Sequence, residues 1–283
     1  MAAAELSLRQ FLRTCKHALS AQGALAETEQ ALDKWTIIAC QALNAERHDI
    51  VRFAIKVLHE AYVALPLSGV QVIEKRLAVA VRLYVVGSLA VRLAAWESLR
   101  SIVLQAAELH SAKGDYVHSS WIRHAHVEAA RAGLTNDDDS GAYLISASRR
   151  LAVSESSMRP DLPDAAVTSV NPSPDDALLN SLCQFDILYC LLVSAEGVTS
   201  AKSMYPSSAS FDEYRADPAL VLVADDGAVR ASLFPASDDR QIAAAMHHLL
   251  RKAMTEAMRF GGRWWGPPPS VQTFLTTNGQ QPA

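Results

Sequence analysis

The sequence predicts an all-α protein, and three observations support this prediction. From Val70 to Ala107 the chain has no proline and one glycine, and apolar residues recur every three or four positions, which is the spacing of one helix face. The same spacing covers most of the chain. Half of the 283 residues are hydrophobic but only 7% are aromatic, which favours close helix packing over pleated sheets.

The first 153 residues are predicted to form an N-terminal helical bundle. Gly23, Pro66 and Gly133 mark helix ends within it. The segment 70–107 is expected either to break near Gly87 into two antiparallel helices or to remain one long helix. The other expected helices span residues 4–21, 25–44, 46–65, 116–132 and 143–153.

Small residues around Gly87 indicate that another helix crosses the 70–107 segment at close range. Ser88 and Ala90 follow this glycine, and Ala94 and Ala95 come soon after. Side chains of this size let two helix axes approach. We therefore expect Gly87 to be a packing residue.

The second half is predicted to be a separate helical lobe, residues 174–283, joined to the bundle by a Pro/Ser-rich linker, residues 154–173. Ser173 and Pro174 form a strong helix start, and Gly197 ends that helix. A further helix is expected over residues 238–260, and the tail 261–283 is expected to be irregular because it contains three consecutive prolines.

The segment Asp217–Phe234 allows two interpretations. Apolar, partly β-branched runs on either side of Asp226 and Gly227 are a β-hairpin signal. Asp217 followed by Pro218 is a good helix start, however, and the apolar residues after it keep helical spacing. Two short helices are the favoured interpretation.

The overall architecture is expected to be an irregular antiparallel helical bundle or a short α-solenoid. Helix pairs recur at about forty residues, but no convincing sequence repeat accompanies them. The irregular bundle is therefore preferred.

No catalytic, cofactor-binding or metal-binding motif stands out in the sequence. The spacings of nucleophile elbows, zinc metalloproteases and phosphate-binding loops do not occur. His124 and His126 are two positions apart on an expected helix and so point to different sides, unlike zinc ligands. Asp137–Asp139 lack the spacing of a calcium loop. The four cysteines are expected to be buried thiols.

Charge gives little support to nucleic-acid binding. Through Arg100 there are 12 Lys and Arg against 9 Asp and Glu, and after it 14 against 21. The mildly basic first part is below the charge density of a typical nucleic-acid binder. Seven of these cations motivate the hypothesis of nucleic-acid or ligand binding, but they are expected mostly on solvated helix faces. They are Arg47, Arg52, Lys75, Arg76, Arg82, Arg92 and Arg100.

Five residues are candidates for binding a partner. Trp264 and Trp265 are adjacent in the irregular tail, where they are expected to clamp the tail to the body or to anchor a partner. Arg76, Arg82 and Arg92 belong to the basic first half.

One stretch of the sequence resembles a known group of proteins. The pattern Leu83-Tyr84-x-x-Gly87-x-x-Ala90-Val91, then Trp96, Leu99 and Arg100, and later Trp121-x-Arg123-His124-Ala125, resembles helical accessory regions of multi-domain bacterial proteins, some linked to anti-phage defence. The resemblance covers about a third of the chain and carries over no catalytic position. It implies a recognition or assembly part that accompanies an effector encoded elsewhere.

These observations favour a non-catalytic interaction, scaffold or sensor component of a bacterial complex, with a protein partner or self-association and no cofactor. A regulator that responds to a ligand or nucleic acid is the second hypothesis, and an enzyme the third. Charges in the first 16 residues exclude a signal peptide, and no apolar run reaches the length of a membrane span, so a cytoplasmic location is expected.

Overall fold

A computed structural model describes residues 9–14, 24–65, 70–107, 133, 140–154, 174–196, 206–211, 214–260 and 266–279. These residues contain helices and no strands, which confirms the all-α prediction. Residues 9–14 are helical. The labelled helices are α2 (Leu25–Asn44), α3 (His48–Ala64), α4 (Val70–Arg92), α5 (Trp96–Ala107), α7 (Ser140–Ser154), α8 (Pro174–Ala195), α9 (Ser208–Phe211), α10 (Asp217–Asp225), α11 (Gly227–Leu233), α12 (Asp239–Phe260) and α13 (Pro269–Asn278).

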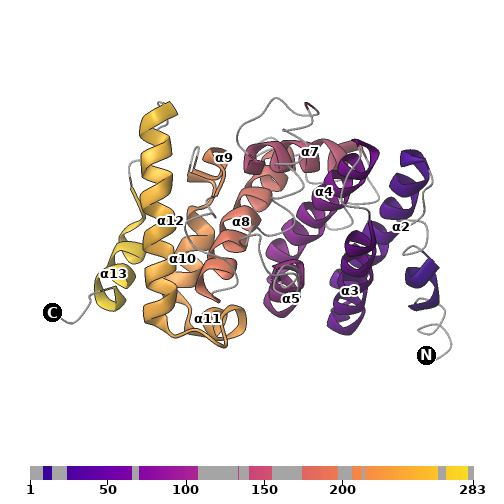
Figure 1. The fold of residues 1–283 in the computed structure, drawn as a ribbon. Coiled ribbons are helices and arrows are strands. Elements are labelled where there is room, and N and C mark those ends of the chain that lie inside the picture. The colour runs from indigo at the N-terminus through magenta and orange to yellow at the C-terminus, as the bar shows by residue number, and fades with distance from the viewer. Residues whose placement is uncertain are drawn as a thin grey trace.

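Four long helices form a central row, in the order α2, α4, α8 and α12, and each packs against the next (Figure 1). Helices α3 and α5 pack together beside this row, and α11 packs against α5. Helix α7 packs against α4 and α8, while α10 and α12 both contact α13. Helices α2 and α13 lie at opposite ends of the elongated assembly.

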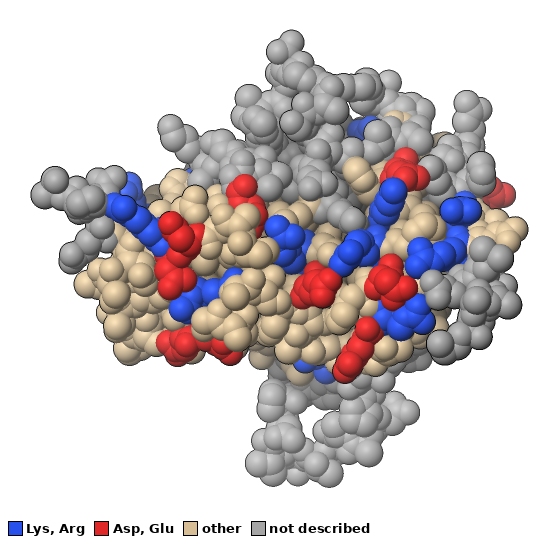
Figure 2. Space-filling view, turned by 90° about the horizontal axis from the view of Figure 1, so that it is seen from below, with Lys and Arg blue, Asp and Glu red and all other residues tan. Residues whose placement is uncertain are grey.

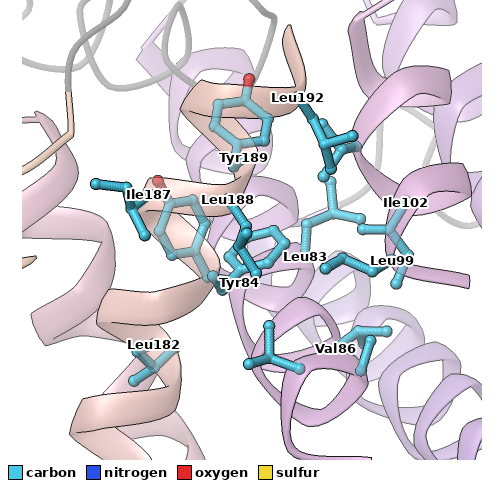
Figure 3. Close-up of a cluster of buried hydrophobic side chains, with 14 of the residues drawn as sticks. Leu83, Tyr84, Val86, Leu99, Ile102, Leu182, Ile187, Leu188, Tyr189 and Leu192 are labelled. Atoms are coloured by element: carbon cyan, nitrogen blue, oxygen red, sulfur yellow. The ribbon is translucent and has the colours of Figure 1, made fainter. Parts of the chain in front are cut away.

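One hydrophobic cluster joins the described helices of both predicted lobes. It begins at Leu12 and continues to Phe274. Its centre lies between α4, α5 and α8, where Leu83, Ile102 and Leu188 meet (Figure 3). The division at 154–173 remains a prediction, because residues 155–173 lie outside the described part. The core itself crosses that boundary.

The break in the 70–107 segment is not at Gly87, as one interpretation had it, but at the residues between α4 and α5. Ala94 has a left-handed backbone, with φ of 51°. The N–H of Ala95 donates to the carbonyl of Ala90, and that of Ala94 donates to Val91. This is a Schellman motif, which satisfies the last carbonyls of a helix and turns the chain. Here alanine holds the position that glycine usually fills.

Gly87 lies instead within α4, at the crossing with α8. A Cβ atom at this position would overlap the ring of Phe185. Phe185 also packs edge-on against Tyr84, with ring centroids 5.0 Å apart. The predicted close crossing is therefore confirmed.

Two short helices occupy the ambiguous segment Asp217–Phe234, so the hairpin interpretation is wrong. Pro218 lies in the first turn of α10, where its missing N–H costs nothing. Asp226 then caps α11, because its Oδ1 accepts hydrogen bonds from the N–H groups of Ala228 and Val229. The Asp-Gly pair therefore begins a helix rather than turning a hairpin.

The expectation of an irregular tail is wrong for α13. Its first residue, Pro269, is the last of three consecutive prolines, and a helix tolerates proline in its first turn. Val271 and Phe274 are three positions apart and both buried, so the helix has one apolar side. The proline run is a helix start here.

Replacing Gly87 with leucine should lower the free energy of unfolding by about 1 to 3 kcal/mol or more, because the new side chain overlaps the Phe185 ring. Urea unfolding followed by circular dichroism measures this loss. Ala244→Leu is the matched control, since Ala244 is exposed on α12. Equal stability of the two variants would contradict a close crossing.

Candidate functional site

A fully buried carboxyl group forms the most connected polar site in the described core. Asp186 lies in the middle of α8, and its Oδ1 accepts a hydrogen bond of 2.7 Å from the Tyr84 hydroxyl on α4. Its Oδ2 accepts from the Ser207 N–H at 2.7 Å and from the Ser210 hydroxyl at 3.0 Å. One side chain thus joins α4, α8 and α9.

Helix α8 makes this carboxyl group unusual. The stretch Ala177–Ala195 has a mean hydropathy of 1.5 and is long and apolar enough to cross a membrane, so the expectation that no apolar run reaches that length is wrong. Asp186 is the single charged residue of this stretch. In this structure 72% of the stretch is buried against other helices, as expected for the central helix of a helical protein. A buried polar group in such a helix requires hydrogen-bond partners, and α4 and α9 supply them.

A histidine and a serine meet where α3 and α5 begin. His48 Nδ1 and Ser98 Oγ are 2.7 Å apart, within hydrogen-bond distance. Contact of this kind is the first requirement of a serine nucleophile. Ser98 is only 1% exposed, however, so a substrate would not reach its hydroxyl without movement of the helices. The pair joins the first turns of two helices.

Arg230 connects three helices at the C-terminal end. Its Nη1 donates to the carbonyls of Val223 and Ala224 at the end of α10, both at 2.8 Å. Its Nε donates to Asp239 at the start of α12, also at 2.8 Å. The guanidinium carbon lies 5.0 Å from the centre of the Phe274 ring on α13.

An open groove of about 470 Å³ lies beside Arg230, between α11 and the start of α12. Phe234 and Ile242 are buried beneath it, and Asp238 and Asp239 lie at its edge. Both acids are engaged within the protein: Asp238 Oδ1 accepts from the Gln241 N–H, and Asp239 pairs with Arg230. The groove therefore shows a mixed surface without a strong charge preference.

The predicted partner-binding arginines are not on a shared open surface. Arg76 and Arg82 are each only 6% exposed, so the expectation that they lie on a solvated face is wrong. Helix α4 is enclosed by several neighbours, which cover the polar side of its sequence as well. Arg82 pairs with Asp33 on α2 at 2.8 Å, and Arg76 stacks over the Tyr62 ring at 5.2 Å. Arg92 is half-buried in the last turn of α4.

Several predicted features lie outside the described residues. These are Trp264 and Trp265, the acidic run 137–139, the histidines from 110 to 126, and Cys15. Cys40, Cys183 and Cys190 are buried thiols, as expected. Within the described ranges, no group of three or more His, Cys, Asp or Glu side chains is placed to hold a metal ion.

Surface charges pair with one another at the start of α3 and between α3 and α5. Arg52 on α3 pairs with Glu97 on α5 at 2.7 Å. Arg47 pairs with Asp49 at 3.0 Å, and this hydrogen bond lowers the pKa of the Asp49 carboxyl. Figure 2 shows basic and acidic side chains interspersed on the face seen from below.

Comparison with known proteins gives no further guide to the site. No protein-family model, curated protein or solved structure matches the chain.

Replacing Arg230 with methionine should lower the free energy of unfolding by about 2 to 3 kcal/mol, because it leaves two carbonyls of α10 and the Asp239 carboxyl without their donor. Methionine retains most of the apolar stem. The control is Arg52→Met, which breaks an exposed ion pair and should cost less than about 1 kcal/mol. Chemical denaturation of both variants measures the difference, and equal losses would contradict the connecting role of Arg230.

The stability of the protein should fall as the pH drops below about 6.5, partly because of His59 on α3. Burial lowers the pKa of this histidine, and its Nε2 has no hydrogen-bond partner within the described structure. The unfolded chain therefore binds the proton more readily than the folded protein, so stability rises with pH across this range.

His59→Gln should reduce this pH dependence, measured as the free energy of unfolding at a series of values between pH 5 and pH 8. His247→Gln on the exposed side of α12 serves as the control. If the two variants and the original protein show the same slope, a lowered pKa of the partly buried His59 is wrong.

Proposed function

We propose that the protein is a non-catalytic helical scaffold or interaction component, of the kind that its resemblance to bacterial accessory regions implies. The observation that carries this proposal is that buried polar side chains form hydrogen bonds between helices. They join helices to one another, as Asp186 joins α4, α8 and α9. Groups held this way fix the position of helices.

Two further buried groups have the same role. The Trp35 indole N–H on α2 donates to the Ala54 carbonyl on α3 at 2.9 Å. The Ser148 hydroxyl on α7 donates to the Val81 carbonyl on α4 at 2.9 Å. These contacts attach α3 and α7, which lie beside the row, to α2 and α4 within it. An elongated row of packed helices offers long lateral surfaces, as helical repeat proteins do.

The surface chemistry favours a protein partner over nucleic acid. Binding to a phosphate backbone requires a concentration of free cations. Arg47 and Arg52 pair with acids instead, and Lys75 is buried on α4. A surface with both signs interspersed provides specificity towards a complementary protein surface. The regulator of the alternative hypothesis therefore has less support.

Expression of the tagged full chain in its native cells, followed by co-purification and light scattering, should show a stoichiometric protein partner or self-association. A second preparation with Arg52→Glu and Glu97→Arg retains the ion pair but exchanges the two charges. Loss of association in this variant would place the interface on α3 and α5. A chain that remains monomeric and repeatedly recovers no partner would contradict the proposal.

A further inference from the structure

One face of α12 is exposed along the described part of the helix. The other face carries the buried apolar residues, and α12 packs against α8, α9 and α13 at one end of the row (Figure 1). Five exposed residues lie on the open face, at alternating steps of four and three positions. They are Arg240, Ala244, His247, Arg251 and Met254, and we call them the α12 seam.

The spacing of the α12 seam is that of a helix that pairs with another helix. Alternating steps of three and four positions keep side chains in one line along a helix, so a second helix can contact all of them. Ala244 is small and lets the axis of a second helix come close. Met254 is 40% exposed and offers a flexible apolar contact, as methionine does at many binding surfaces.

The charge of the α12 seam is of one sign. Neither Arg240 nor Arg251 forms an ion pair with another described residue, and none of the five seam residues is acidic. Arg52 on α3 and Arg230 on α11, by contrast, are both paired with carboxylates. Because charges across an interface are arranged to be complementary, a partner of the seam should be acidic.

We propose that the α12 seam is the docking surface for an acidic amphipathic helix of a protein partner. Carboxylates of that helix lie opposite Arg240 and Arg251, and apolar side chains lie opposite Ala244 and Met254. The alternation of cations with apolar residues favours a protein helix over nucleic acid, because binding to a phosphate backbone depends on a larger number of cations. This inference rests on the proposed function and adds the chemistry of the partner.

Fluorescence anisotropy with the purified full chain tests the docking surface. The probe is a labelled synthetic helical peptide about three heptads long, with glutamate and leucine alternating along its own seam. This peptide should bind saturably, and higher salt should weaken its binding. Arg240→Glu combined with Arg251→Glu should weaken binding by about tenfold or more, because both attractions become repulsions.

Lys34→Glu combined with Lys56→Glu is the matched control. It changes the net charge by the same amount, at exposed cations on α2 and α3 that belong to no such row. At physiological salt it should alter binding by no more than about twofold, because distant charges are screened.

The docking surface is overturned if the peptide does not bind, or if the two double variants weaken binding equally. It is also overturned if double-stranded DNA with the same number of negative charges binds more tightly than the peptide. If the peptide fails while the chain still recovers a protein partner or self-associates, the docking surface is wrong and the proposed function stands. A monomeric chain that recovers no partner would contradict the proposed function instead, whatever the peptide does.

Discussion

The enclosure of α4 is the constraint on which the rest of the structure depends. This helix packs against α2, α3, α5, α7 and α8, and every residue from Lys75 to Val91 is buried. A helix covered on all sides leaves no room for an ordinary side chain where a neighbour comes closest, and Gly87 occupies that place under the Phe185 ring. Because α8 crosses α4 there, the position of α8 follows, and α8 in turn supports α9, α10 and α12.

The long helices could be predicted because their limits are marked locally. Helix α2 ends at Asn44 and α8 begins at Pro174, both as expected. Local sequence signals gave wrong predictions where the conformation or burial of a residue depended on contacts with distant segments. The prolines before Val271 were expected to keep the tail irregular, but they start a helix, which the burial of Val271 and Phe274 stabilises. The apolar stripe of α4 did not reveal that helices would also cover Arg76 and Arg82, since that burial depends on segments far along the chain.

The polar sites could not be predicted from local sequence patterns, for the same reason. Tyr84 and Asp186 are 102 positions apart, and His48 and Ser98 are 50 apart, so no helical spacing connects them. The signal that was present is a single acid within the apolar stretch of α8. An isolated charge in a sequence that is otherwise suited to a core indicates that some other segment must supply donors. The sequence does not say which segment.

The same acid has a consequence for the newly made chain. Until α9, α10 and α12 are synthesised and packed against it, the segment 177–195 is an incompletely covered helix with the length and hydropathy of a membrane-spanning helix. Asp186 is at its midpoint, where a carboxylate opposes insertion into a lipid bilayer by about 2.5 to 3.5 kcal/mol on a translocon scale. The residue that accepts hydrogen bonds from Tyr84, Ser207 and Ser210 in the folded protein thus also opposes insertion of the nascent helix into a membrane.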